Sequence, residues 1–387
     1  MKLKQIVLSC VMAACSFDAE GLYSESFEFE KPKRTLYENA KEPLPELEPI
    51  TIKLYNNPFS EGLEKTKTEY EKICRYHKIY YSHRDKKETI AKIQDNLVVL
   101  GYLNQESFKR GELSQTTISA IQGYKRANGI KKTGKISRRF IRHINIPIKK
   151  RIKMLETALK LSEGLKASDY QVIVNIPEFK MRFYAHHLLV HQDDTCVGAR
   201  YDHGKWSKKW RTDIQKGKII KVRVNPIWHI PSSISSRLGY KDKKWLKKRG
   251  YYWKRNRWRQ RPGLNNTLGR IAFPFKSNYG ELLHGTPNKK VFQKNIRAFS
   301  HGCMRLKDEI SFFKVLQKEG LIKNYNLEVL LKAKKGRYIN KKIKLIKPIK
   351  VNVIYMLASA IKIDDKWAAV FPKDIYRLRK SKIKKGH

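Results

Sequence analysis

The sequence predicts an α+β protein, with a helical region in the first half of the chain and a β-rich domain in the second. Three observations support this prediction. Apolar residues recur at spacings of three and four between residues 86 and 146, as on one face of a helix. From residue 170 onward, apolar and polar residues alternate, as in strands. The 387 residues are 41% hydrophobic and 11% aromatic, which is enough apolar mass for two or three folded domains.

The first 18 residues are predicted to be an export signal. Lys2 and Lys4 precede an apolar run at residues 6–14, and small residues follow it before Asp18. An ordinary first strand is the alternative interpretation. Cys15 follows two alanines, as in lipoprotein signals, so lipid attachment at this residue and plain cleavage nearby both stay open. We therefore expect a periplasmic protein, lipid-anchored if Cys15 is modified.

Residues 19–85 are expected to form an N-terminal region that is extended at first and helical later. Four prolines between residues 32 and 49 interrupt any regular pattern, which predicts an extended leader. The mixed polar segment at 63–81 has the length and composition of a helix. After the first twenty positions, no run of about 18 apolar residues occurs, and this excludes a polytopic membrane protein.

The region 86–146 is predicted to fold as three short helices. The first helix should end at Gly101, which suits the left-handed turn that closes many helices. Ser114 and Ser137 are the expected N-caps of the second and third helices. A basic helix is expected after them, at about 149–165. The apolar face of the first helix is made of Ile90, Ile93, Leu97 and Leu100.

Residues 168–379 are predicted to form the β-rich domain. Val172 and Val174 alternate with polar residues in the segment 170–176, which is typical of a half-buried strand. A closing hairpin is expected around residues 351–355. Other strands are expected at 180–184, 188–191, 219–224 and 270–275. The run of His186, His187 and His191 suggests a metal site at first sight, but strand alternation supplies no third ligand, which favours a surface hairpin.

The segment 237–262 is almost entirely cationic and aromatic, and it is too polar to be part of a core. One interpretation is a solvated surface insertion. The other is a binding element, either a lid over a binding site or a face that binds a polyanion. A lid could cover a substrate with large apolar side chains. Those side chains are Trp245, Tyr251, Tyr252, Trp253 and Trp258.

The window 282–307 holds a cysteine and two histidines within 25 positions. A cysteine acts as a nucleophile when a neighbouring base removes its proton, and both His284 and His301 are candidates for the base of Cys303. His301 lies two positions before Cys303, so on a strand both side chains would share a face. The distances along the sequence do not show which of the two histidines is the base. A zinc site made of these three residues is disfavoured, because structural zinc takes four protein ligands.

Small residues surround this cysteine. Gly285, Ser300 and Gly302 suit a tight backbone path whose amide groups could face an oxyanion. Two further cysteines lie beyond the predicted signal, so the number of thiols is odd. At least one thiol would then stay unpaired in an oxidising compartment. A disulfide between Cys74 and Cys196 stays open.

The window resembles the signature of the L,D-transpeptidases, whose catalytic domain is called YkuD. That signature is a histidine, about fifteen residues, and then Ser/Thr-His-Gly-Cys followed by a hydrophobic residue and Arg or Asn. The matching residues here are His284, Ser300, His301, Gly302, Cys303, Met304 and Arg305. The stretches 174–184, 224–234 and 261–273 are similar to a longer, YcbB-like Gram-negative branch. In that branch a substrate-capping loop occupies the place of residues 237–262.

The resemblance implies a β-sandwich or barrel-like catalytic domain and a role for each matching residue. Cys303 would be the nucleophile and His284 its base, with the Gly285 carbonyl orienting the imidazole. His301, Gly302 and the Cys303 amide would line the acyl pocket and oxyanion hole, with Ser300 beside them, and Arg305 would brace the loop. No metal or other cofactor is implied. A carbapenem would be expected to acylate the same thiol.

The region 86–146 resembles the three-helix peptidoglycan-binding module through IQDNLVVLGYL, LSQTTISAIQGYKRANGI and TGKIS, although a generic small helical bundle stays open. The implied reaction joins two peptidoglycan stem peptides. The donor tetrapeptide would lose its terminal D-Ala, and a 3→3 cross-link would form. The implied partners are stem peptides and glycan, with no specific nucleic acid. A peripheral membrane association also stays open.

Two alternatives compete with this function. Transfer to water in place of an amine would make the protein an L,D-carboxypeptidase or a hydrolase of wall attachments. A basic nucleic-acid or polyanion-binding protein is the alternative from another class, because 84 Lys and Arg against 35 Asp and Glu give a net charge of +49. Charge alone does not separate these classes. The export signal and the His-Gly-Cys sequence favour the enzyme.

Overall fold

The computed structural model describes residues 58–73, 75–80, 86–165, 168–235, 242–276, 282–334, 336–363 and 366–378. The predicted export signal, the extended leader, Cys15 and Cys74 lie outside these residues. The chain divides into two units, Met1–Ile52 and Lys53–His387, and the fold described below belongs to the second unit. None of the helices described is both long and apolar enough to span a bilayer.

The helices predicted between residues 86 and 165 are confirmed, whereas the segment 63–81 is helical only as far as Glu71, in a helix that begins at Pro58. Ser114 accepts a hydrogen bond from the Thr117 amide at the start of one helix, and Ser137 accepts one from the Phe140 amide at the start of the next. Gly101 has a φ of +78°, the left-handed conformation expected after a helix. The helices are α2 (Pro58–Glu71), α3 (Lys86–Val99), α4 (Gln115–Ala127), α5 (Arg138–Ile144) and α6 (Ile148–Ser162), with a 3₁₀ turn at Gln105–Ser107.

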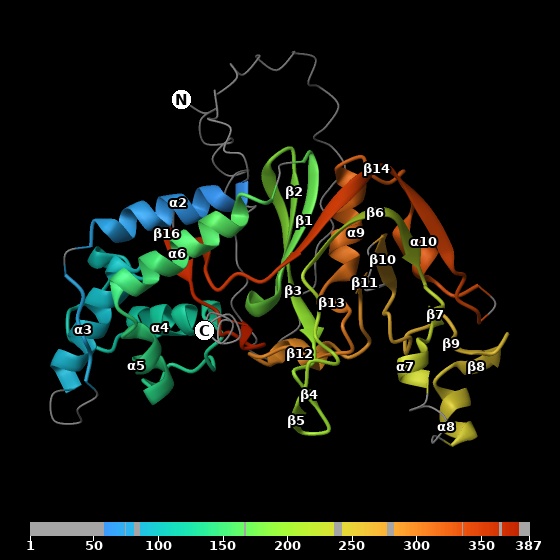
Figure 1. Ribbon diagram of the computed structural model, residues 1–387, viewed down its shortest axis with the longest axis horizontal. Helices are drawn as coiled ribbons and strands as arrows, with labels where there is room; N and C mark the ends of the chain where they lie inside the picture. The colour runs from blue at the N-terminus through green and yellow to red at the C-terminus, as the bar shows by residue number, and fades with distance from the viewer. Residues whose placement is uncertain are drawn as a thin grey trace, which may run out of the picture. The chain divides into compact units, whose positions relative to one another are not determined.

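The second half of the unit is a sheet that closes on itself (Figure 1). Its strand order is β12-β3-β13-β11-β10-β6-β14-β1-β2, and a further pairing of β2 with β3 joins the ends, so eight strands surround an apolar core. The strands are β1 (Tyr170–Asn175), β2 (Lys180–Ala185), β3 (Leu188–Gly198), β6 (Gln215–Val224), β10 (Ile271–Lys276), β11 (Leu282–His284), β12 (Ala298–Ser300), β13 (Met304–Leu306) and β14 (Lys341–Ile354). The strands expected from alternation are confirmed.

Strand β1 is buried on both faces, so the prediction of a half-buried strand is wrong. Val172 and Val174 face the barrel core, whereas Ile173, on the other face, belongs to a second apolar cluster with the helices. The helices therefore cover the outer face of the barrel at this strand. The alternation of apolar and polar residues within one strand does not show whether helices from elsewhere in the chain cover its outer face.

The remaining elements are short. They are β4 (Tyr201–Asp202), β5 (Lys205–Trp206), β7 (Trp228–His229), α7 (Ser232–Ser235), α8 (Lys243–Lys248), β8 (Tyr251–Lys254), β9 (Arg257–Gln260), α9 (Glu309–Lys318), α10 (Leu327–Leu331), β15 (Ser359–Ile363) and β16 (Lys366–Val370), with 3₁₀ turns at Ile176–Glu178 and Lys289–Gln293. Residues 351–354 belong to the long strand β14, and the closing hairpin is β15–β16, further along the chain than expected.

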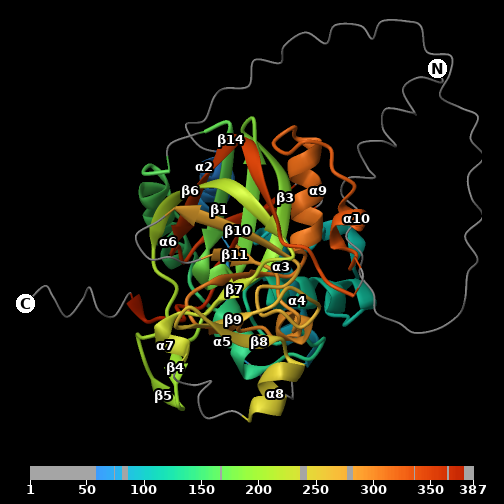
Figure 2. The ribbon, with the colours of Figure 1, turned by 90° about the vertical axis from the view of Figure 1, so that its right-hand side faces the viewer.

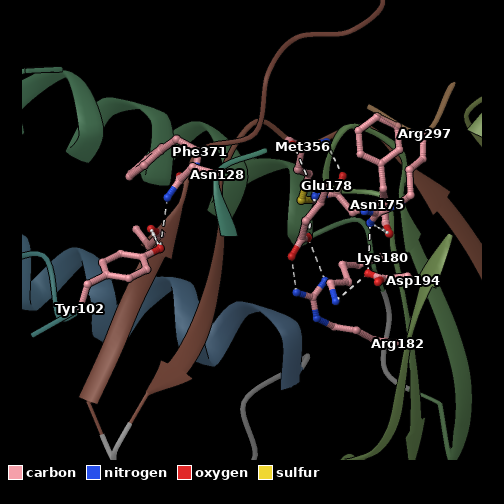
Figure 3. A network of polar contacts seen from close by, with 12 residues as sticks. Tyr102, Asn128, Asn175, Glu178, Lys180, Arg182, Asp194, Arg297, Met356 and Phe371 are labelled. Atoms are coloured by element: carbon pink, nitrogen blue, oxygen red, sulfur yellow. Dashed lines mark hydrogen bonds and ion pairs between the residues drawn. The ribbon is translucent and has the colours of Figure 1, made fainter. Parts of the chain in front are cut away.

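The C-terminal hairpin and the residues after it are bound to the helices (Figure 3). The Tyr102 hydroxyl donates a hydrogen bond to the Ala369 carbonyl at 2.9 Å, and the Asn128 side chain accepts one from the Phe371 amide at 2.7 Å. A ring nitrogen of His143 lies 3.1 Å from the Phe371 carbonyl. Residues from both ends of the unit therefore build one shared core.

A buried ion pair lies at the end of β1 (Figure 3). The Arg182 guanidinium donates to both carboxylate oxygens of Glu178, and both side chains are at most 4% exposed. Asn175 donates to the same carboxylate and to the Met356 carbonyl, while its own oxygen accepts the Met356 amide. Because a buried charge that loses its partner is costly, these contacts fix the end of β1 against the segment that follows β14.

His186 and His187 form the turn between β2 and β3, with φ values of 48° and 67°. Two successive residues of positive φ are the geometry of a tight two-residue hairpin. His191 lies further along β3, with its ring stacked on Phe312. The three histidines thus belong to a hairpin, as the sequence favoured.

Candidate catalytic site

The sheet brings His284 next to the segment that holds Cys303. Strand β11 pairs in parallel with β13, with Leu283 opposite Met304 and His284 opposite Arg305. Leu283 and Met304 face the barrel core, so the alternation of strand side chains directs His284 and Arg305 to the other side. Cys303 directly precedes β13. Residues nineteen positions apart in the sequence are thereby gathered beside one strand pair.

The environment of His284 favours a neutral imidazole. Its side chain is 3% exposed, and burial, together with the nearby Arg305 charge, lowers its pKa to about 3. Nδ1 lies 2.5 Å from the Gly285 carbonyl oxygen, so Nδ1 carries the hydrogen and donates it. Nε2 is then left with its lone pair. The geometry gives a neutral base with a fixed tautomer at ordinary pH.

His301 lies in a different environment. Strand β12 ends at Ser300 and β13 begins at Met304, so the segment between them is a loop, and Gly302 has a φ of +109°. The expectation that His301 and Cys303 share a strand face is therefore wrong. The His301 ring is exposed and contacts Trp210 edge to face, with centroids 4.5 Å apart. Of the two histidines, His284 is the buried one, and a backbone carbonyl fixes its tautomer.

The carbonyl groups of Gly302 and Cys303, on either side of the Cys303 N–H, each accept a hydrogen bond from a side-chain hydroxyl. The Thr212 hydroxyl donates to the Gly302 carbonyl at 2.6 Å and accepts the Gly198 amide at 2.8 Å. The Ser300 hydroxyl donates to the Cys303 carbonyl at 2.5 Å. Because a trans peptide is planar, fixing the Gly302 carbonyl directs the Cys303 N–H to the opposite side. The amide is thereby pre-oriented as an oxyanion donor would need to be.

Sequence reasoning missed Thr212 and Trp210. Thr212 lies ninety positions before Gly302 in the chain, and it belongs to no recognisable motif. A close approach also requires glycine at position 198, because a Cβ there would lie 2.0 Å from the Trp210 carbonyl oxygen. The turn that carries Trp210 and Thr212 thus packs directly against the end of β3. No local signal in the sequence pointed to this contact.

Glu309 closes the other side of the site. Its side chain is 3% exposed and accepts hydrogen bonds from the Lys289 ammonium at 2.5 Å and from the Arg270 amide at 3.3 Å. A Cβ at position 285 would lie 2.1 Å from the Glu309 carboxyl carbon. The carboxylate therefore occupies the space beside the residue whose carbonyl orients His284, and only glycine fits at position 285.

Substitution of Gly285 by alanine is expected to destabilise the protein by about 1–3 kcal/mol, because the methyl group overpacks this contact. Gly123→Ala is the matched control. That residue is inside helix α4 with nothing within 4 Å of the added carbon, so stability should rise by about 0.5–1 kcal/mol. Urea unfolding measures both changes. Equal stability of the two variants would contradict the close contact with Glu309.

The cationic, aromatic segment forms a small structure of its own (Figure 2). Strands β7, β9 and β8 pair as a three-stranded sheet, and Ile230 and Leu246 are buried beneath it. Trp245 is stacked on Tyr251, and Trp253 is 56% exposed. The other two aromatic residues are Tyr252 and Trp258, of which Trp258 packs against Trp253. Residues 236–241 lie outside the described residues.

The base of this segment adjoins His284. The Asn266 side chain donates to the Arg261 carbonyl at 2.8 Å, and its oxygen accepts the Leu268 amide at 2.8 Å. The Leu268 backbone also hydrogen-bonds with His284, which acts to raise its pKa against the larger effect of burial. Gly269 packs against Gly285 so closely that a Cβ there would lie 2.5 Å from the Gly285 carbonyl carbon. Asn266 therefore connects the segment to the histidine.

The second described thiol differs from Cys303. Cys196 is fully buried, and burial raises its pKa, so it stays protonated. Its proposed disulfide partner, Cys74, lies outside the described residues. Within the described ranges, no three His, Cys, Asp or Glu side chains are placed to bind a metal ion.

Comparisons with solved structures return L,D-transpeptidases of low sequence identity and low TM-score. An L,D-transpeptidase of Xylanimonas cellulosilytica is 12% identical, with a TM-score of 0.25, over 73% of this chain and 98% of that one. An L,D-transpeptidase of Stackebrandtia nassauensis is 14% identical, with a TM-score of 0.29, over 72% of this chain and 94% of that one.

In sequence, one relative and one family model each match part of the chain. A Haemophilus influenzae protein that is provisionally named an L,D-transpeptidase is 27% identical over 173 residues. The match covers 38% of this chain and 34% of the relative, so the chain spans about a third of that protein's length. The model of the L,D-transpeptidase catalytic domain, YkuD, matches residues 169–322, which include the barrel strands from β1 to β13 but not β14, together with His284 and Cys303. The segment 169–322 is therefore a YkuD-type L,D-transpeptidase catalytic domain.

Proposed function

We propose that this protein is an exported L,D-transpeptidase that forms 3→3 cross-links in peptidoglycan through a thioester on Cys303. The observation that carries the proposal is the neutral, buried His284. Its tautomer is fixed by Gly285, and it lies on the strand beside the one that Cys303 precedes. A base held in this form can accept a thiol proton without first losing one of its own. The domain match in residues 169–322 supports the reaction class.

In the first step, the Cys303 thiol gives its proton to Nε2 of His284, and the sulfur attacks the diaminopimelate carbonyl of a donor tetrapeptide. The carbonyl oxygen gains negative charge and accepts hydrogen bonds, one of them from the Cys303 amide, which the fixed Gly302 and Cys303 carbonyls orient. The C–N bond to the terminal D-Ala then breaks. The departing amine takes the proton from His284, and an acyl thioester remains on Cys303.

In the second step, the side-chain amine of another stem peptide attacks the thioester. His284 accepts a proton from that amine as the new amide bond forms, and the proton returns to the sulfur when the C–S bond breaks. Water in place of the amine would release a tripeptide. Transpeptidation and hydrolysis on this site therefore differ only in the acceptor, and exclusion of water decides between them.

Incubation of the purified protein with a disaccharide-tetrapeptide tests the proposal. Intact-mass spectrometry should show a covalent adduct equal to the donor minus D-Ala, and peptide mapping should place it on Cys303. Product analysis should show cross-linked dimer together with free D-Ala. A protein that forms neither adduct nor product would contradict the proposal, and tripeptide as the sole product would assign the protein to the hydrolases.

We further propose that the segment 237–262 caps the substrate. Its base adjoins His284 through Asn266 and Leu268, and it presents the exposed ring of Trp253. Large apolar rings can shield a thioester from water, and the surrounding Lys and Arg can pair with stem carboxylates. Such a cap would favour an amine acceptor over water.

The double variant Trp245→Ala/Trp253→Ala is expected to lower the ratio of cross-linked dimer to free tripeptide several-fold, because water reaches the thioester more easily. These two rings are partly exposed, so the fold should survive their loss. Chromatography of the products measures the ratio. Tyr80→Ala, which removes another exposed ring, is the control and should leave the ratio unchanged. An unaltered ratio and rate in the tryptophan variant would remove the cap from the mechanism.

A further inference from the structure

The outward side of two neighbouring barrel strands is almost purely cationic. Strands β6 and β14 pair antiparallel, and neither contains Asp or Glu. Their apolar residues alternate into the barrel core, which leaves the basic residues on the outer side. We call this outer side the cationic face, and it consists of Lys216, Lys218, Lys221, Arg223, Lys342, Lys344, Lys347 and Lys350. Figure 2 shows the two strands side by side.

The register places like charges directly opposite each other. Arg223 faces Lys342, and Lys221 faces Lys344. Lys218 faces Lys350 beyond a register shift. Like charges in directly opposed positions destabilise a strand pair, so the fold gains nothing from this arrangement. Among the described residues, no carboxylate forms an ion pair with Lys218, Lys221 or Lys344.

The positive field extends beyond the two strands. His229, on β7, has a pKa below its ordinary value, first because of burial and then because of nearby cations. These cations are Arg259, Arg223, Lys342 and Arg257. Two of them belong to the cationic face and the other two to β9. Cations of the cationic face and cations of β9 therefore lie near one another around His229.

Two isoleucines are exposed within the cationic face. Ile220 is 48% exposed and Ile346 is 62% exposed. They lie where the pairing of β6 with β14 is interrupted between Lys344 and Ile349. Exposed apolar side chains surrounded by cations suit the boundary between lipid headgroups and acyl chains. Neither strand carries an aromatic residue, whereas single-stranded nucleic acid is bound by stacking on aromatic rings.

We infer that the cationic face binds the surface of a bilayer that contains anionic phospholipid. The lysines meet lipid phosphates, and Ile220 and Ile346 enter the headgroup region. The opposing anionic surface removes the repulsion between the facing cations, which supplies the compensation that the isolated chain lacks. This inference is independent of the proposed enzymatic function, since none of these residues takes part in the catalytic site.

Sedimentation of the full chain with vesicles tests the inference. The vesicles are phosphatidylcholine alone or phosphatidylcholine mixed with phosphatidylglycerol. The face variant carries Gln at four positions, and the control variant carries four Lys→Gln changes at exposed positions among the helices, so both lose the same charge. The face positions are Lys218, Lys221, Lys342 and Lys344, and the control positions are Lys131, Lys132, Lys149 and Lys150.

We expect binding to anionic vesicles that weakens with salt and is absent with phosphatidylcholine alone. The face variant should lose at least about tenfold in vesicle partitioning, and the control less than about threefold. Because the N-terminal segment is the same in all proteins, it does not affect the comparison. Equal losses in both variants, or no binding to anionic vesicles by the wild type, would overturn the inference.

A second variant separates a membrane from a soluble polyanion. Ile220→Ser/Ile346→Ser keeps every charge, so it should weaken vesicle binding and leave binding to a single-stranded oligonucleotide unchanged. Thermal unfolding confirms that the proteins compared are folded. If the serine variant binds vesicles as the wild type does, the apolar part of the inference is wrong and a purely electrostatic polyanion site replaces it.

Discussion

Replacement of Cys303 by alanine is expected to abolish turnover of a disaccharide-tetrapeptide, with a loss of at least about ten-thousand-fold. The proposed thioester cannot form without the sulfur, and the neighbouring donors stabilise nothing once the nucleophile is absent. The substitution removes one small, partly buried side chain, so the fold should be retained. Product chromatography measures the rate, and circular dichroism checks the fold. Activity within tenfold of the wild type would disprove the assignment.

The same variant should fail to react with a carbapenem, whose strained carbonyl can acylate the thiol of the wild-type protein. One adduct per chain is expected for the wild type by intact mass. Cys196→Ala is the matched control, because Cys196 is the other thiol in the described residues and is buried and protonated. It should keep the adduct. An adduct that persists on the Cys303 variant, or disappears from the Cys196 variant, would place the reactive thiol elsewhere.

Substitution of His284 by glutamine is expected to lower transpeptidation by about 100- to 10,000-fold, because glutamine fills similar space but accepts no proton. His301→Gln is the control. The His301 ring is exposed and contacts Trp210, so its loss should cost far less than the loss of His284. Single-turnover acylation of the two variants measures the difference. A dead His301 variant beside a nearly normal His284 variant would reverse the assignment of the base.

The lowered pKa of His284 also predicts how the stability of the His284 variant depends on pH. Its folded pKa of about 3 is below the unfolded value of 6.5, so the unfolded chain binds the extra proton between these pH values. The stability that comes from keeping His284 neutral is therefore complete above pH 6.5 and is lost as the pH falls toward 3. The slope is at most about 1.4 kcal/mol per pH unit. In His284→Gln, urea unfolding should show a smaller loss of stability over this range.

Local signals in the sequence predicted the elements and the reactive motif. The caps at Ser114 and Ser137 and the turn at Gly101 depend on side chains within a few residues, and the structure has all three. The spacing from His284 to Cys303 identified the candidate catalytic window. It left the choice of base open, because the strand pairing that separates the two histidines is a property of the closed sheet.

The parts that could not be predicted depend on distant segments. The outer face of β1 is buried because helices earlier in the chain cover Ile173. Thr212 reaches Gly302 across ninety positions of sequence, and Glu309 excludes any side chain at position 285. The residues that flank Ile173, Thr212 and Glu309 in the sequence form no motif that would single them out. The role of each comes from a contact that only the completed fold creates.

The hydrogen bonds that join the helical region to the C-terminal hairpin and to the residue after it constrain the order in which the chain can fold. The Tyr102–Ala369 and Asn128–Phe371 hydrogen bonds join positions 267 and 243 residues apart. During synthesis, the helices emerge long before these partners exist, so their apolar faces cannot be fully covered until the last strand has been made. Contacts of such long range also slow folding, since a large loop must close before they form. A nascent chain that lacks Phe371 would therefore expose the helical core and be open to proteases until the ribosome reaches the end of the domain.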